Sequence, residues 1–233
     1  MSRVPRLHVP GLPPTGRVRL PEEEGHHLVR VLRARPGDPV RLFDGLGREV
    51  ECTVVDAGKP GAIVEITREL EAPRPAREVV LCTSIPRGDR MEWLVEKAVE
   101  AGVAAILPLA AERSVRKEAG ANSMRRWARA ATEAAKQCGR ASVPEIAEPM
   151  ELADAIVRTA AATRVAATPG VGARLGDVLP AAGSVAVFIG PEGGFEPRET
   201  ALLAEAGARP FGLGPLVLRI ETAAVVSVHV AAN

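Results

Sequence analysis

The chain has 233 residues with a net charge of +1, and 46% of them are hydrophobic, which excludes a disordered chain and permits two packed domains. Tyrosine is absent and aromatic residues make up 3%, which argues against recognition of RNA by stacking bases on an aromatic sheet. The three cysteines, Cys52, Cys82 and Cys138, form no Cys-x-x-Cys pair, and no histidine has metal-ligand spacing. We therefore expect no disulfide scaffold, no metal site and a cytoplasmic location.

The first part of the chain is rich in short β segments. Runs of Val, Ile and Thr predict strands at 39–43, 49–55 and 62–67, separated by turn residues such as Asp44-Gly45. The spacing of apolar residues predicts one or two helical turns at 24–32. Several short strands in so small a segment favour a small β-barrel.

A proline-rich break follows these strands. Pro73 and Pro75 lie in the segment 71–76, where they prevent regular structure and stiffen the chain as in a linker. The break predicts a first domain at residues 1–72 and a second at residues 76–233.

After the break, strands and helices alternate. Strands are predicted at 78–84, 104–109, 164–168, 185–189 and 209–213. Helices are predicted from Asp89 to Gly102 and at 123–138, 152–160, 198–206 and 222–232. Alternation of this kind indicates an α/β domain with a mostly parallel, doubly wound sheet.

Two glycine-rich loops follow predicted strands. They are Gly190-Pro-Glu-Gly-Gly-Phe195 and Gly212-Leu-Gly-Pro-Leu216. Ligands of open α/β sheets bind beyond the carboxyl ends of the strands, where glycine lets the backbone approach them closely. Neither loop has the pattern of a dinucleotide fingerprint or a P-loop, and either one alone is also compatible with an ordinary strand-to-helix turn.

Two charges interrupt the apolar run from Leu216 to Thr222. Arg219 and Glu221 stand there among leucine, valine and isoleucine. Charges in apolar surroundings are costly unless they are paired or functional, which makes this pair a candidate site. The alternative is an outward-facing pair at a helix start, where Glu221 would favour the helix dipole.

Basic residues are concentrated in two stretches. Residues 113–140 hold eight basic and two acidic residues, a net charge of +6, and residues 1–41 have a net charge of +4. Such patches bind phosphate backbones, although solvated helix faces have a similar composition. On the predicted helix at 123–138, Arg125 and Arg129 lie away from the side that carries Trp127.

The two glycine loops and the Arg219–Glu221 segment occur together in an order that resembles the SPOUT superfamily. The chain is most similar to the RsmE-type enzymes, which use S-adenosylmethionine to methylate ring nitrogen 3 of a uridine in bacterial small-subunit (16S) ribosomal RNA. The resemblance covers nearly the whole chain. Its motifs include His26-His-Leu-Val-Arg-Val-Leu-Arg33, Glu112-Arg-Ser114, Glu133-Ala-Ala-Lys-Gln137, Gly190-Pro-Glu-Gly-Gly-Phe195 and Leu218-Arg-Ile-Glu-Thr-Ala223.

The resemblance implies a fold and an assembly. Residues 1–72 would form a PUA-like RNA-binding β-barrel. Residues 76–233 would form a SPOUT methyltransferase domain that contains a trefoil knot, an exception to the rule that chains do not thread loops. Two copies would form a homodimer with shared active sites, with small-subunit ribosomal RNA or the small ribosomal subunit as partner and no membrane.

The chemistry of this reaction and the charge pattern make individual residues candidates for its roles. Arg219 would stabilise charge on the base, and Glu221 or Glu192 would handle its proton. The residues implied to hold the donor are Ile189, Gly190, Pro191, Glu192, Gly193, Gly194, Leu213, Gly214, Leu216 and Leu218. The residues expected to contact RNA are Arg3, Arg6, Arg30, Arg33, Arg113, Arg125, Arg126, Arg129 and Arg140. A Gly193→Val change is expected to place a side chain against the donor.

Two other functions stay open. Another SPOUT enzyme could methylate the ribose 2'-oxygen of an RNA. A non-catalytic RNA-binding assembly factor would need no donor, so a measurement of S-adenosylmethionine binding separates it from an enzyme.

Overall fold

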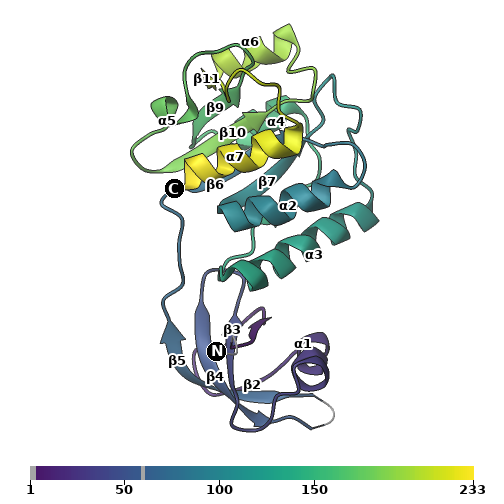
Figure 1. Ribbon diagram of the computed structural model, residues 1–233, viewed down its shortest axis with the longest axis vertical. Helices are drawn as coiled ribbons and strands as arrows, with labels where there is room; N and C mark the ends of the chain where they lie inside the picture. Colours follow the sequence, from purple (N-terminus) through teal and green to yellow (C-terminus); the bar gives the residue numbers. More distant parts are fainter. Residues whose placement is uncertain (1–3, 59–60) are drawn as a thin grey trace. The chain divides into compact units, whose positions relative to one another are not determined.

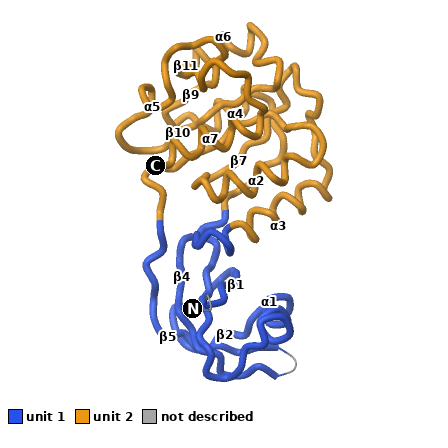
Figure 2. Tube along the Cα trace, viewed as in Figure 1, with its two compact units in different colours: residues 1–73, 135–143 blue, residues 74–134, 144–233 orange. Residues whose placement is uncertain are grey.

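The chain forms two compact units, coloured separately in Figure 2. The computed structural model describes residues 4–58 and 61–233. Unit 1 comprises Met1–Pro73 and Ala135–Val143, and unit 2 comprises Arg74–Ala134 and Pro144–Asn233. The division therefore assigns residues 135–143 to unit 1, whereas the linker pattern placed them in the second domain.

Unit 1 contains a curled five-stranded sheet in the order β1-β3-β4-β5-β2. The strands are β1 (Arg6–His8), β2 (Arg17–Arg19), β3 (Pro39–Phe43), β4 (Glu49–Asp56) and β5 (Ile63–Leu70). Strand β1 pairs with β3 in parallel, and the other pairs are antiparallel. Alternate residues such as Val40, Leu42, Cys52 and Val54 are buried, as the period-two pattern of a half-buried sheet requires. The predicted small barrel is thus a sheet with β1 and β2 as its edges.

A short helical segment contributes to the same core. Helix α1 (Glu22–His26) continues directly into a single π-helical turn, η1 (His27–Val31). Leu28 from this turn is fully buried with the sheet residues. Arg33, just beyond it, has a φ of +56°, a conformation that side chains other than glycine adopt rarely.

A buried arginine, Arg6, joins the two segments of unit 1. The Nε of Arg6 lies 2.9 Å from the Oε1 of Glu49, with the two side chains only 6% and 5% exposed. The remaining guanidinium nitrogens donate to the carbonyls of Ala135, Lys136 and Arg140 at 2.9, 3.0 and 3.2 Å. A second ion pair links Lys136 to Glu24. Arg6 therefore holds residues 135–140 in place.

Unit 2 contains a six-stranded sheet in the order β11-β9-β10-β6-β7-β8, with every pair parallel. The strands are β6 (Glu78–Ser84), β7 (Val103–Leu109), β8 (Glu145–Ile146), β9 (Thr163–Ala167), β10 (Ser184–Ile189) and β11 (Arg209–Phe211). The prediction of a mostly parallel sheet is confirmed. The chain order changes direction beside β10, which is where such sheets open a crevice for ligands.

Helices cover the sheet of unit 2, as Figure 1 shows. The helices are α2 (Arg90–Ala101), α3 (Ala121–Cys138), α4 (Leu152–Arg158), α5 (Leu175–Val178), α6 (Pro197–Glu205) and α7 (Ile220–Ala232). Helices α2 and α7 lie side by side. Leu152 of α4 and Leu203 of α6 pack with Cys82 and Phe188 of the central strands. Across the part of the chain that the structure describes, no helix has the length and apolar character to cross a membrane.

Candidate active site

Three loops meet at the carboxyl edge of the sheet in unit 2. They follow β9, β10 and β11, which are neighbours in the order β11-β9-β10. Because the strands are parallel, their carboxyl ends lie at one edge and bring residues 168–170, 190–196 and 212–219 together. The two predicted glycine loops are therefore adjacent in space, although about twenty residues separate them in sequence.

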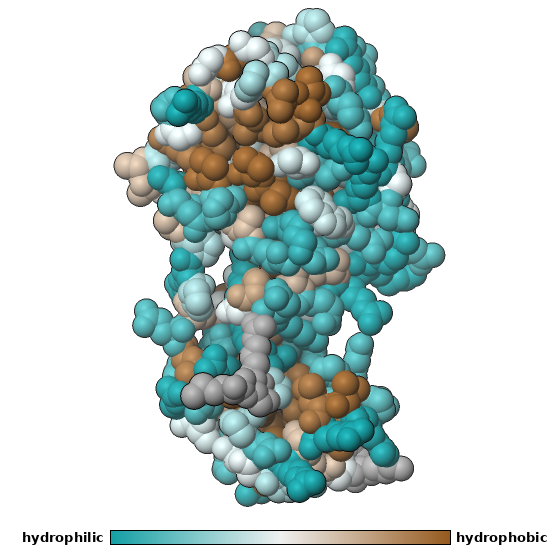
Figure 3. Space-filling view, in the orientation of Figure 1, coloured by the Kyte–Doolittle hydropathy of each residue, from teal (hydrophilic) through white to brown (hydrophobic). Residues whose placement is uncertain are grey.

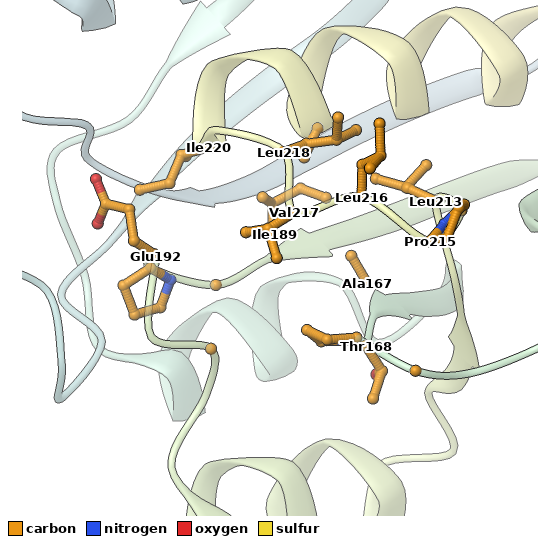
Figure 4. A pocket seen from close by; sticks show the side chains of 17 residues that line it. Ala167, Thr168, Ile189, Glu192, Leu213, Pro215, Leu216, Val217, Leu218 and Ile220 are labelled. Atoms are coloured by element: carbon orange, nitrogen blue, oxygen red, sulfur yellow. The ribbon is translucent and has the colours of Figure 1, made fainter.

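A pocket lies between these loops (Figure 4). Its walls are mostly backbone and apolar side chains, with Glu192 at one end and Leu213 and Pro215 at the other. The predicted donor-binding residues that line it are Ile189, Gly190, Pro191, Glu192, Gly194, Leu213, Gly214, Leu216 and Leu218.

Gly193 is the one predicted donor-binding residue outside the pocket lining. A Cβ atom added to Gly193 would lie 3.3 Å from the Cδ of Arg113. The expectation that Gly193→Val places a side chain against the donor is therefore not supported, since the added side chain would press on Arg113 instead.

The pocket has a third wall that was not predicted from the sequence. Residues 167–170, at and just after the end of β9, line the pocket from the side opposite Leu216 and Leu218. The signal was present, because Pro169-Gly170 comes directly after a predicted strand, but one glycine is a weak pattern. Ile220 and Ala223 of α7 also line the pocket and were not predicted.

Close backbone contact fixes two of the loops to each other. The backbone N–H of Gly212 donates to the carbonyl of Ala173 at 2.8 Å. A Cβ atom on Gly212 would lie only 2.1 Å from the carbonyl oxygen of Val171, closer than any real contact. Only glycine fits at this position, where the loop after β11 crosses the segment after β9.

Gly212→Ala is expected to destabilise unit 2 by about 1–3 kcal/mol, as overpacking against a backbone atom does. Because the displaced segment also carries pocket residues, binding of the S-adenosylmethionine donor that the resemblance implies should weaken as well. Chemical denaturation and calorimetry measure the two effects. Gly176→Ala is the matched control, since its added Cβ has no atom within 4 Å. Equal stability and donor affinity for the Gly212 and Gly176 variants would contradict this account.

Arg219 and Glu221 have different surroundings. Glu221 is only 7% exposed, and its Oε1 lies 3.7 Å from the Nε of Arg90, so its buried charge has a partner. Arg219 is exposed at the start of α7, between the pocket residues Leu218 and Ile220. Its backbone carbonyl accepts from the N–H of Ala223 at 2.9 Å, whereas its side chain has no hydrogen-bond or ion-pair partner within residues 4–58 and 61–233. The predicted catalytic residue Arg219 is thus exposed and adjoins, along the chain, two residues that line the pocket.

The predicted RNA contacts in unit 1 divide into exposed and engaged arginines. Arg3 lies outside the described residues. Arg30 and Arg33 are exposed. The buried Arg6 uses its donors within unit 1, so its placement does not support an RNA contact. Arg140 donates to the hydroxyl of Ser142 at 2.9 Å, and its partial burial lowers the pKa of its guanidinium.

The predicted RNA contacts in unit 2 lie on α3 and on the loop before it. Arg125, Arg126 and Arg129 are exposed on α3. Arg125 donates to the side chain of Asn122, and the Nε of Arg126 lies 3.1 Å from a carboxylate oxygen of Glu92. Arg113, on the preceding loop, binds Glu196 and the Gly193 carbonyl.

Family models match both parts of the chain. The RNA methyltransferase domain matches residues 73–232, and the RNA methyltransferase PUA domain matches residues 20–67. The parallel sheet, its glycine-loop pocket and the PUA-type sheet of unit 1 therefore define an RNA methyltransferase with an added PUA domain.

Whole-chain relatives narrow the class. Ribosomal RNA small subunit methyltransferase E of Mycobacterium bovis is 36% identical over 231 residues, covering 95% of this chain and 88% of that protein. The protein of the same name from Bacillus subtilis is 30% identical over 217 residues, covering 86% of this chain and 84% of that protein. This chain belongs to the ribosomal RNA small subunit methyltransferase E family, which confirms the resemblance to RsmE-type enzymes.

Solved structures agree with this membership. Ribosomal RNA small subunit methyltransferase E of Neisseria gonorrhoeae, bound to S-adenosyl methionine, superposes with a TM-score of 0.88 at 31% identity, covering 97% of this chain and 95% of that one. A methyltransferase of Legionella pneumophila in complex with the same cofactor gives a TM-score of 0.87 at 34% identity, covering 99% and 97%.

Proposed function

We propose that this protein transfers a methyl group from S-adenosylmethionine to ring nitrogen 3 of a uridine in bacterial small-subunit ribosomal RNA. The observation that carries the proposal is the three-loop pocket with Arg219 beside its lining residues, the guanidinium having no partner among the described residues. Family membership supplies the substrate class, since its relatives are named for the small-subunit ribosomal RNA.

The pocket suits S-adenosylmethionine. The glycines at 190, 194 and 214 expose backbone groups that can bond polar atoms of the donor, and apolar residues such as Leu213 and Leu218 can cover its adenine. Glu192 adds a carboxylate at one end, which favours the positive charges of the donor. When bound, the donor supplies an electrophilic methyl group on a sulfonium. The protein's residues hold it and orient the base in line with it.

The uridine base must lose the proton on its ring nitrogen, and we assign different parts of this step to Arg219, Glu192 and Glu221. Arg219 donates hydrogen bonds to the uridine oxygens as negative charge develops on them. Glu192 lines the pocket with an exposed carboxylate, and we assign proton removal to it. Glu221 is buried against Arg90 and is better suited to orienting the start of α7. A paired target uridine would have to leave its helix to reach the pocket.

One assay tests the proposal against its alternatives. Purified protein is incubated with S-adenosylmethionine and either protein-free small-subunit RNA or small subunits from cells that lack the protein. Mass mapping should then find one methyl group on a uridine base. A methyl group on a ribose oxygen would indicate the other SPOUT chemistry. Absence of donor binding and of any methylation would indicate an assembly factor.

Replacement of Arg125, Arg126 and Arg129 by Ala together should weaken RNA binding and flatten its salt dependence. Each lost phosphate contact should lower the salt slope by about one unit. Donor affinity should stay the same, because α3 contributes no residue to the pocket. Salt-titrated binding measures the slope, with the double variant Arg158→Ala and Arg209→Ala as a charge-reduced control. If the triple variant kept the wild-type salt slope, α3 would not be part of the RNA-binding surface.

A homodimer belongs to the same proposal. Apolar side chains gather over α7 and the loop before it (Figure 3), where Leu216 and Val217 are 77% and 90% exposed and Val226 and Val230 are partly exposed. Covering this surface in a homodimer would remove it from water and complete a shared site. Sedimentation at micromolar concentration tests the dimer.

We also propose that residues 76–233 contain a trefoil knot and that residues 1–72 bind RNA. We propose that the protein meets its ribosomal substrate in the cytoplasm.

A further inference from the structure

The loop between β10 and α6 has few bonds of its own. Within residues 190–196, the backbone N–H of Gly194 donates to the Pro191 carbonyl at 2.8 Å. Gly194 has a φ of +72°, in the region open mainly to glycine. A segment with three glycines loses much conformational entropy when it is ordered, so contacts from elsewhere must help to fix it.

Arg113 contacts this loop at two points. It lies on the segment between β7 and α3, 83 positions before its partner Glu196. Its Nε lies 2.5 Å from the Oε1 of Glu196, and its Nη1 donates to the carbonyl of Gly193 at 2.8 Å. A guanidinium presents several donors in a rigid plane, so one side chain can fix both groups at once.

Glu199 makes a second connection between the same two segments. This buried carboxylate accepts from the backbone N–H of Glu112 at 2.9 Å with one oxygen and from that of Glu196 at 2.8 Å with the other. The Nε of Arg198 also donates to the side chain of Glu112 at 2.6 Å. Residues 112 and 113 are thus cross-linked to the start of α6 by charge-assisted bonds, the stronger kind of hydrogen bond.

We infer that Arg113 and Glu199 are positioning residues that hold the donor-binding loop in its pocket-forming conformation. The inference rests on the proposed function. Arg113 lies outside the pocket lining and binds Gly193 and Glu196, which are also outside it. The residues between them and next to them, Gly194 and Glu192, do line the pocket. Arg113 therefore acts on the donor through the loop, in contrast to the phosphate contact that its place in the basic segment suggested.

The experiment compares Arg113→Ala and Arg113→Lys with Arg158→Ala, an exposed arginine that pairs with Glu145 elsewhere in unit 2. Without the Arg113 contacts, the loop at 190–196 should adopt its donor-binding conformation for a smaller part of the time. If that part is about a tenth, the Kd for S-adenosylmethionine rises roughly tenfold in Arg113→Ala. Arg113→Lys should recover only part of the loss, since an ammonium lacks the planar fork that reaches two acceptors. Arg158→Ala should keep the wild-type Kd. The salt slope of RNA binding should be unchanged in all three variants.

Glu199→Gln provides an independent test from the other connection. It preserves the shape of the side chain, but its amide nitrogen cannot accept from a backbone N–H, so one of the two bonds is lost. Donor affinity should fall several-fold while the fold is retained, as circular dichroism and the melting temperature report. Glu196→Gln keeps an acceptor for Arg113 and should bind the donor more tightly than Glu196→Ala.

Distinct outcomes overturn the inference. If Arg113→Ala melts at a lower temperature but each folded molecule binds the donor as the wild type does, Arg113 is purely structural. If its RNA salt slope falls by about one unit with unchanged donor affinity, Arg113 is a phosphate contact. Should Arg113→Ala not fold, a wild-type Kd in both Arg113→Lys and Glu199→Gln would overturn the inference. If the wild-type protein fails to bind S-adenosylmethionine, the proposed function fails, and the inference with it.

Discussion

Replacing Arg6 by Ala is expected to lower the free energy of unfolding of unit 1 by about 3–5 kcal/mol, the usual cost of removing one partner of a buried ion pair. The variant leaves the Glu49 carboxylate buried without its cation. It also leaves the carbonyls of Ala135, Lys136 and Arg140 without the donors that Arg6 supplies. Urea unfolding followed by a probe in unit 1 measures the change.

The same sheet offers a matched control. Arg17 and Glu65 form an ion pair of 4.0 Å, with the side chains 66% and 52% exposed, so Arg17→Ala should cost less than about 1 kcal/mol. Replacing both members of the buried pair, as Arg6→Met with Glu49→Leu, should recover much of the loss because no charge stays unpaired. If Arg6→Ala and Arg17→Ala cost the same, the buried pair does not hold unit 1 together.

Arg219→Ala is expected to slow the methylation step by on the order of a hundredfold, as removal of one donor to a developing oxyanion does. Affinity for S-adenosylmethionine and for RNA should stay near the wild-type values. The reason is geometric: Arg219 lies beside residues that line the pocket, with its guanidinium unpartnered among the described residues. Single-turnover methylation of small-subunit RNA separates this step from binding.

A control variant distinguishes chemistry from loss of charge. Arg209→Ala also removes an exposed arginine from unit 2. Arg209 is the first residue of β11, at the opposite end of that strand from the pocket loop, and it donates to the carbonyl of Val178, so the methylation rate of this variant should be unchanged. Arg219→Lys should recover only part of the rate, since a lysine cannot reproduce a planar two-donor contact. A full rate in Arg219→Ala, with only a lower melting temperature, would assign Arg219 to stability.

The predictable part of the fold is the part with sequence periodicity. The strands at 39–43 and 78–84 match β3 and β6 in the structure, because alternating or continuous apolar residues mark a buried strand. The three-residue strands β1 and β2 and the two-residue β8 were missed, since such segments are too short to show a period. Their pairing with distant strands decides their conformation.

The candidate site divides along similar lines. Glycine loops after strands could be located because the carboxyl ends of parallel strands share an edge, which places them near one another without further information. The arginines could not be sorted in the same way. Arg6 and Arg113 lie in the two basic stretches of the sequence, which are typical of RNA-binding surfaces. Their acidic partners, Glu49 and Glu196, lie 43 and 83 positions away. A count of charges in a short segment therefore cannot predict which arginines are already paired in the fold.

The return of residues 135–143 to unit 1 affects how this protein can be made and divided. During synthesis the strands of unit 1 leave the ribosome first, but the last segment of this unit begins in the final turn of α3 and emerges only after the rest of that helix. About sixty residues of unit 2 must therefore be synthesised before Arg6 can bind its three carbonyl partners in residues 135–140. For the same reason, moving residues 1–73 alone onto another enzyme would transplant an incomplete domain, with the Arg6 guanidinium separated from the three carbonyls that it binds.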